Sequence, residues 1–167
     1  ALHVTATWVS PDSTVLKYLL TAPDVNFGLP MLDVSGIPFL DGGTLIHLAM
    51  RVQMGLDRIE AFLGHDTVDI NARLPPNGVT ALHLLCMGDQ SVDDVDKMRL
   101  LLKHGADIHC RTSEESGGVT PLEFLYMFKP ESNEYWEQKA ALLIQASGAK
   151  SSEEVMEMFP SLRRAEY

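Results

Sequence analysis

The stretch that decides the fold is residues 78–109, which read GVTALHLLCMGDQSVDDVDKMRLLLKHGADIH. A Gly-x-Thr turn leads into an apolar segment at 80–86, where we expect a first helix. A polar break follows, and then a second apolar segment at 95–103 that Gly105 ends. The stretch therefore predicts a turn, two short helices and an extended exit.

The same pattern returns in three other places along the chain. The leucine that follows the turn stands at four positions about 40 residues apart, namely Leu2, Leu45, Leu82 and Leu122. Such units bury their apolar faces against their neighbours and form a solenoid. We expect a truncated first unit at 1–26 and further units at 27–71, 72–109 and 110–150. Within these units we expect helices at 13–20, 56–63 and 134–146.

Residues 78–83 resemble the G-x-T-P-L-H motif that opens an ankyrin repeat, and residues 105–108 resemble its G-A-D-V exit. The resemblance covers residues 1–150. It implies an all-α ankyrin solenoid of helix-turn-helix units with extended finger loops, acting as a protein-protein interaction module and not as an enzyme. Residues 151–167 predict a C-terminal capping helix and a tail, because Ser151 and Glu154 have the spacing of a capping box.

Composition narrows the classes of partner. The net charge is −10, from 13 Lys and Arg against 23 Asp and Glu, which disfavours a nucleic-acid partner. No apolar run approaches the roughly 18 residues that span a bilayer. The two cysteines form no C-x-x-C pair and favour an intracellular site, in the cytoplasm or the nucleus. We expect a protein partner, no membrane and no cofactor.

The two ends of the array differ in what the sequence predicts for them. Ala1 already reads as the interior of an opening motif, which fits either a fragment of a longer protein or a processed end. We expect fraying or self-association through this truncated first unit. Residues 27–40 form an apolar insertion rich in Gly and Pro. Two roles remain open for this insertion, namely folding back over its own unit or extending the binding surface.

His3, His47 and His83 occupy the same place in three opening motifs, and Glu123 replaces them in the fourth. The family resemblance implies that each histidine pairs with the Thr of its own motif and with the backbone of the adjacent unit. Catalysis is disfavoured because no nucleophile recurs beside the histidines. In the fourth motif, Thr120 and Glu123 have the spacing of a capping box.

Two further sets of residues bear on metal binding and on side-chain modification. The zinc-ligand types His83, Cys86, His104, His109 and Cys110 fit no closed four-ligand spacing, so we expect no metal; a metal-dependent enzyme built on them is the weaker alternative. Asn71 resembles the asparagines that an asparaginyl hydroxylase modifies in ankyrin repeats. Its alternative role is to close the exit turn with hydrogen bonds.

The resemblance places the binding site on the concave face, formed by the finger loops and the first helix of each unit. The partner-binding positions on this face are Trp8, Leu40, Asp41, Arg51, Val52, Val79, Met87, Val119, Met127 and Phe128. Aromatic and methionine side chains there predict an apolar stripe suited to an apolar or basic protein segment. Asp93 and Asp94 are expected on an exposed inserted turn away from it. The alternative is a regulatory ankyrin domain of a larger enzyme or multidomain protein.

Overall fold

The computed structural model describes residues 25–31, 40–52, 54–87, 91–130, 133–160 and 162. The predicted first unit, with its helix at 13–20, His3 and Trp8, therefore lies outside the described residues, apart from residues 25 and 26. The tail from 163 onward lies outside them as well.

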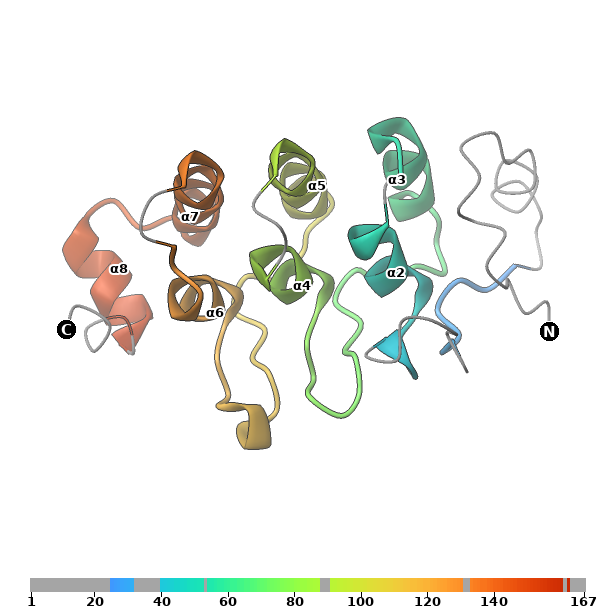
Figure 1. Ribbon diagram of the computed structural model, residues 1–167, viewed down its shortest axis with the longest axis horizontal. Coiled ribbons are helices and arrows are strands. Elements are labelled where there is room, and N and C mark those ends of the chain that lie inside the picture. Colours follow the sequence, from blue (N-terminus) through green and yellow to red (C-terminus); the bar gives the residue numbers. More distant parts are fainter. Residues whose placement is uncertain are drawn as a thin grey trace.

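Short helices alternate with longer ones along the chain. In order, they are α2 (Leu45–Arg51), α3 (Leu56–Leu63), α4 (Ala81–Met87), α5 (Val92–Lys103), the 3-10 turn η3 (Glu114–Ser116), α6 (Pro121–Met127), α7 (Glu134–Ser147) and α8 (Ser152–Met158). Figure 1 shows α2, α4 and α6 side by side in one row, with α3, α5 and α7 in a second row above them. We call the first row the inner helices and the second row the outer helices. The all-α solenoid predicted from the sequence is confirmed.

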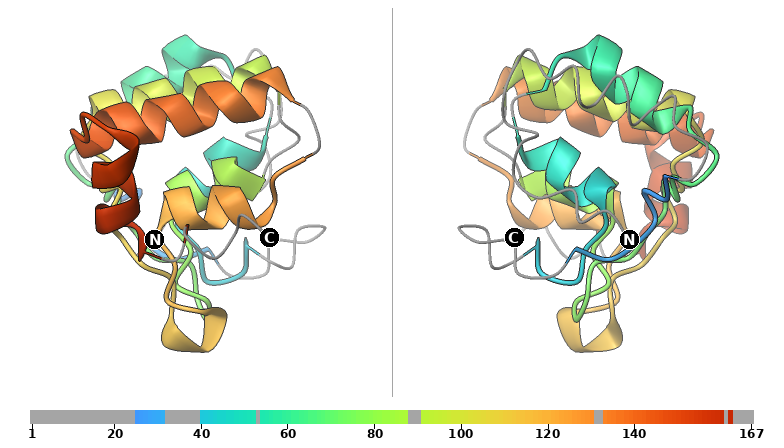
Figure 2. Two further views of the ribbon diagram at one scale, coloured as in Figure 1. Left: turned by 90° about the vertical axis from the view of Figure 1, so that its left-hand side faces the viewer. Right: turned by 90° about the vertical axis from the view of Figure 1, so that its right-hand side faces the viewer.

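The core runs along the stack as a continuous cluster. Outer helices contribute residues spaced three apart, such as Ile59 with Phe62 and Met98 with Leu101, all fully buried. Leu82 of α4 lies in the same cluster and is 2% exposed. At the far end, Phe159 joins the cluster and stacks on His109, with 5.8 Å between the ring centroids. Figure 2 shows α8 lying across the end of the stack, turned away from the direction of α6 and α7.

Several predicted boundaries are confirmed. Helix α3 has the predicted bounds. Helix α7 ends one residue later than predicted, at Ser147, and Gly148 with φ +75° is its C-cap. Ser151 Oγ accepts a hydrogen bond from Glu154 N as a capping residue does, at 3.2 Å. In a capping box the Glu154 carboxylate would accept a hydrogen bond from Ser151 N. Here it accepts from Lys150 N instead, at 2.6 Å.

The predicted start of α5 was wrong. The helix begins at Val92 instead of residue 95, because Ser91 serves as the N-cap and its Oγ accepts from Asp94 N at 3.4 Å. Asp93 and Asp94 therefore belong to the first helical turn, where carboxylates complement the helix dipole. Asp94 is moreover buried, at 8% exposed, so it does not lie on a solvated turn.

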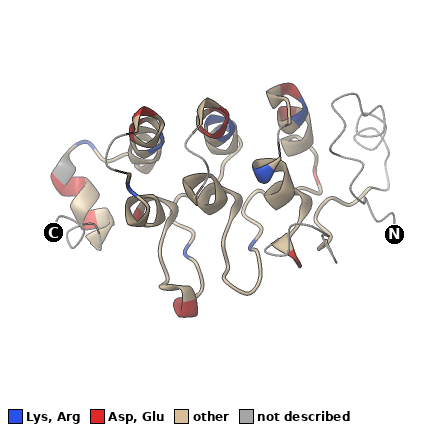
Figure 3. Ribbon diagram, in the orientation of Figure 1, with Lys and Arg blue, Asp and Glu red and all other residues tan. Residues whose placement is uncertain are grey.

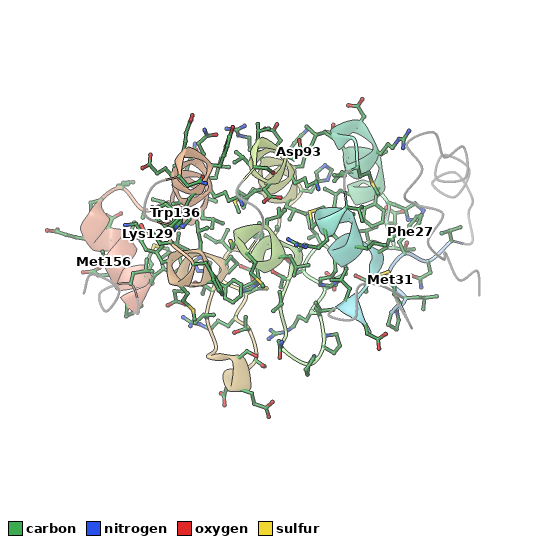
Figure 4. All side chains as sticks on the ribbon, viewed as in Figure 1. Phe27, Met31, Asp93, Lys129, Trp136 and Met156 are labelled. Carbon is green, nitrogen blue, oxygen red and sulfur yellow. The ribbon has the colours of Figure 1, made fainter. Side chains whose placement is uncertain are left out.

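The described ends of the 27–40 insertion pack on their own unit. Phe27 is buried and sets its ring edge-on to Phe62, with centroids 5.3 Å apart. Met31 N donates to Gly43 O at 2.6 Å, and Gly42 N donates to Met31 O at 2.9 Å. Figure 4 shows Phe27 and Met31 beside α2 and α3. At both ends, folding back over the unit is the arrangement observed; residues 32–39 lie outside the described residues.

Two loops project below the inner helices in Figure 1, and we call them finger 1 (residues 72–79) and finger 2 (residues 110–120). Each begins with a backbone pair across its root: Leu74 N donates to Val79 O, and Thr112 N donates to Val119 O. Ser113 N donates to Asn77 O at 2.8 Å and joins the two fingers. The fingers therefore form a hydrogen-bonded row below the inner helices in the view of Figure 1.

Candidate binding face

The amino end of each inner helix is capped by the side chain that lies three residues after the Thr of its motif. His83 Nδ1 accepts from Thr80 N at 3.2 Å and lies 2.8 Å from Thr80 Oγ1. Because Nδ1 is an acceptor, the proton resides on Nε2, which donates to Val119 O of finger 2 at 3.1 Å. His47 repeats the arrangement, with Nε2 3.1 Å from Ala72 O of finger 1. The role that the resemblance implied for these two histidines is confirmed.

Burial keeps both histidines neutral. It lowers the pKa of His83 to about 4, against the opposing effect of the hydrogen bond to Val119. The pKa of His47 is lowered for the same reason. A neutral imidazole suits the position because it must accept at one nitrogen and donate at the other, and a protonated ring could no longer accept from Thr80 N.

Glu123 closes α6, the inner helix of the fourth unit, in a different way. Its Oε2 accepts from Thr120 N at 2.8 Å and from Thr120 Oγ1 at 3.0 Å, which confirms the predicted capping box. A carboxylate cannot donate to a carbonyl of a following finger as the histidines do. It instead accepts from Arg111 Nη1 at 3.4 Å, from its own finger. The substitution of Glu for His thus replaces a bond between units with one inside the unit.

Arginines stiffen the fingers. Arg73 Nη2 donates to Arg111 O at 2.6 Å, from finger 1 to finger 2. Arg111 Nη1 in turn donates to Gly118 O at 2.7 Å, across finger 2. Finger 2 ends in η3, where Glu114 and Glu115 are exposed, and its tip is red in Figure 3. The most protruding part of the face is therefore a rigid loop with an acidic tip.

The carboxyl ends of the inner helices carry exposed apolar side chains. Met87 ends α4 and Met127 ends α6, and these side chains are 51% and 64% exposed. Phe128 follows as the C-cap of α6 and is 50% exposed. Its ring is held edge-on against Phe124, with centroids 5.1 Å apart, and Phe124 lies edge-on to His83. We call Met87, Met127 and Phe128 the apolar patch.

The remaining predicted contact residues divide between surface and core. At the end of α2, Arg51 is exposed and Val52 half-buried, while in the loops Asp41 is exposed and Val119 half-buried. Leu40 and Val79 were predicted to contact a partner, but they are buried. They are 0% and 8% exposed and pack with Leu74 and Leu84 beneath the finger roots. They support the loops from behind, because the fingers fold back over the apolar side of the turn.

Two exposed apolar residues were missed. Leu56 and Val92 are the first residues of α3 and α5, and they are 39% and 52% exposed. Both follow a turn that joins an inner to an outer helix, whereas the apolar patch precedes such turns. The signal was present in the sequence: each precedes an aspartate in a first helical turn, a position that faces water.

Four of the five zinc-ligand types, all but His104, are buried or make other contacts. Cys86 is buried in the core, where burial raises its pKa to about 12. Cys110 Sγ donates to Asp107 Oδ2 at 3.4 Å, and His109 stacks on Phe159. Among the described residues, no three His, Cys, Asp or Glu side chains gather as a metal site would require.

Asn71 bridges two units. Its Oδ1 accepts from Asp107 N at 2.8 Å, and its own N–H donates to Asp69 Oδ1 at 2.9 Å. These bonds give Asn71 a part in closing the exit turn, and hydroxylation of its side chain stays a prediction. Within the described part of the chain, every helix is too short or too polar to span a bilayer.

Comparison with known proteins gives a consistent result. The family model for the ankyrin repeat matches residues 77–113. Two rice proteins (Oryza sativa subsp. japonica), named BTB/POZ domain and ankyrin repeat-containing protein NH5.1 and NH5.2, are each 33% identical to the chain over 110 residues. The match covers 66% of this chain and 20% of each relative, so the chain spans about a fifth of their length. No solved structure is significantly similar to the chain.

Proposed function

Because the chain belongs to the ankyrin repeat family, whose repeats are generally protein-protein interaction modules and typically not enzymes, we propose that it binds a protein partner through the face formed by the inner helices and fingers. The observation that carries the proposal is the apolar patch. Its three side chains stand on neighbouring helix ends, and each is at least half exposed. Methionine and aromatic side chains are enriched at interface cores because they supply large apolar contact areas.

The acidic charges of the chain favour an apolar segment with basic flanks. Asp41 is exposed, and so are Glu114 and Glu115 at the tip of finger 2. The chain as a whole carries a formal charge of −10. Such a field accelerates the approach of a basic partner, while dry contact with the patch supplies most of the affinity. We expect Phe128→Ala to weaken binding by about 2 kcal/mol.

A capture experiment from a cell extract tests the proposal. A Met127→Ser/Phe128→Ser variant removes half-exposed apolar area at the end of α6. The matched control, Leu29→Ser/Met158→Ser, removes exposed apolar side chains elsewhere, since these are 50% and 39% exposed. The native chain and the control should capture the same proteins and the patch variant should lose them, with unchanged circular dichroism. Equal capture by all three would refute this face.

The role within a larger protein is a second proposal. The two rice relatives are named for a BTB/POZ domain as well as ankyrin repeats. That combination favours the chain acting as the recognition module of a multidomain protein. Within it, we propose an array at 1–150 followed by a capping helix and a tail at 151–167. The buried Val155 and Phe159 support a cap at this end of the stack. Limited proteolysis should then leave 72–160 as one resistant fragment.

A further inference from the structure

Two lysines of the outer helices are buried, although lysine is rarely found inside a protein without a partner. Lys139 of α7 is 0% exposed and Lys97 of α5 is 4% exposed. They stand in the same register, each directly before a core residue, Ala140 in α7 and Met98 in α5. Because a buried charge recurs at the same position of two units, its explanation lies in the contacts between neighbouring helix pairs.

Lys139 reaches back into the preceding helix pair. Its Nζ donates to Leu85 O, in the last turn of α4, at 2.7 Å. The same Nζ lies 3.1 Å from Asp94 Oδ2 of α5. The last carbonyls of a helix have no partner within it and carry the negative end of its dipole, so an ammonium group there is favourable.

Lys97 does the same one pair earlier. Its Nζ donates to Val52 O at 2.8 Å and to Met50 O at 3.4 Å, at the carboxyl end of α2. Burial lowers the pKa of Lys97, and the charges of Asp94 and Asp93 oppose that shift. Asp94 thus supports both lysines, one through an ion pair and the other through its field.

The carboxyl end of α6, the last inner helix, receives its hydrogen bond from the outer helix of its own pair. Trp136 Nε1 of α7 donates to Leu125 O of α6 at 3.0 Å. Lys129 lies over the indole, with Nζ 5.3 Å from the ring centroid, and Figure 4 shows both side chains between α6 and α7. The element after α7 is α8 and not another outer helix, so the donor comes from within the pair.

We propose that Lys97 and Lys139 are positioning residues, each holding the carboxyl end of the inner helix of the preceding pair and, with it, the exposed side chains of the binding face. For Lys139 the positioned side chain is Met87, two residues after Leu85. For Lys97 it is the end of α2, with Arg51 and Val52. The importance of these side chains for binding rests on the proposed function; their positioning does not.

A buried ion pair is weak grounds for stability, because desolvation of the charges offsets most of their attraction. Its better-attested use is to specify one arrangement among several of similar energy. The ends of α2 and α4 lead into the turns that join inner to outer helices. Apolar contacts alone would let these ends slide or fray, whereas a donor directed at one or two carbonyl oxygens selects a single position.

The test is methyl NMR of 13C-methyl-methionine protein, measured without any partner. Lys139→Leu should shift or broaden the methyl signal of Met87 and leave that of Met50 unchanged. Lys97→Leu should do the reverse. The matched control is Lys103→Leu, which removes a lysine that pairs with Glu60 of the neighbouring outer helix at the surface. Signals are assigned with Met87→Leu and Met50→Leu.

Amide hydrogen exchange gives a second reading. We expect exchange about tenfold faster in 81–87 for Lys139→Leu and in 45–51 for Lys97→Leu, with 121–127 unchanged in both. If Lys139→Leu fails to fold, Asp94→Asn/Lys139→Leu replaces it, because that variant leaves neither charge of the pair buried. A folded variant with an unmoved Met87 signal, or equal changes along the whole chain, would overturn the proposal. Failure to capture a partner would instead count against the proposed function.

Discussion

The two ends of the inner helices are held by different chemistry. At the amino end of α4, Thr80 and His83 lie three residues apart and close the turn with neutral hydrogen bonds. At its carboxyl end, the donor is a charged lysine 54 residues further along the chain. The turn at the amino end can therefore close within its own motif, and its bond to the next unit, from His83 Nε2 to Val119 O, is added when finger 2 packs. The carboxyl end requires that the next helix pair has already packed, and it depends on a buried charge.

The difference predicts different sensitivities at the two ends. Amino ends should respond to acid, because their histidines must remain neutral. Carboxyl ends should respond to the loss of any member of the buried charge network. Four measurements examine this contrast.

The largest effect should come from breaking the carboxyl-end network. Asp94→Ala leaves Lys139, which is fully buried, without its carboxylate. We expect a loss of about 3–5 kcal/mol in the free energy of unfolding, measured by chemical denaturation. The control is Asp93→Ala, an exposed neighbour in the same helical turn, with an expected change within about 0.5 kcal/mol. Similar losses from both variants would mean that only the helix dipole matters.

The apolar core between the two ends of α4 should stabilise both ends. Leu82→Ala opens a cavity at a residue that is 2% exposed, and we expect a loss of about 2–5 kcal/mol. Leu56→Ala, at a residue 39% exposed, is the control, with an expected loss below about 1 kcal/mol. Hydrogen exchange in Leu82→Ala should rise at both ends of α4. A rise at one end alone would show that the two ends open independently.

Acid should weaken the amino ends. The folded pKa of His83 is about 4, below the ordinary histidine value of 6.5, so the unfolded chain binds more protons between these values and stability falls as the pH drops. Stability is fully present above about pH 6.5, and His83 should cost about 2 kcal/mol at pH 5. Urea melts at pH 7 and pH 5 measure this loss. His83→Gln should show a smaller loss between the two values, with the rest attributable to groups such as His47; an unchanged loss would remove His83 as a cause.

The smallest effect should come from a capping hydroxyl. Thr120 Oγ1 donates to Glu123 Oε2 at 3.0 Å and accepts from Glu123 N at 3.4 Å. Thr120→Ala should cost about 1 kcal/mol in a chemical melt. Thr120→Ser keeps the hydroxyl and should retain most of the stability. Equal losses from the two variants would indicate that the methyl group, and not the cap, contributes the stability.

Much of this architecture could be predicted because its signals are local. A Gly-x-Thr turn, an apolar stripe of helical spacing and a closing glycine all lie within a few residues of each other, and they placed α3 and α7 to within a residue of the observed bounds. The pairing of His83 with Thr80 is equally local, three residues apart on one helix start. The same holds for the exposed Met87 and Phe128, whose positions in the motif point away from the core.

Only the tertiary structure decided which polar side chains lie inside. Asp94 was expected on an exposed turn, because its partner Lys139 comes from a different helix pair and lies 45 residues away in the sequence. Leu40 and Val79 read as exposed turn residues until the fingers fold back over them. Burial depends on what packs against a residue from outside its own unit. A repeat pattern therefore specifies the fold of each unit, and the contacts between units determine which of its charged side chains are buried.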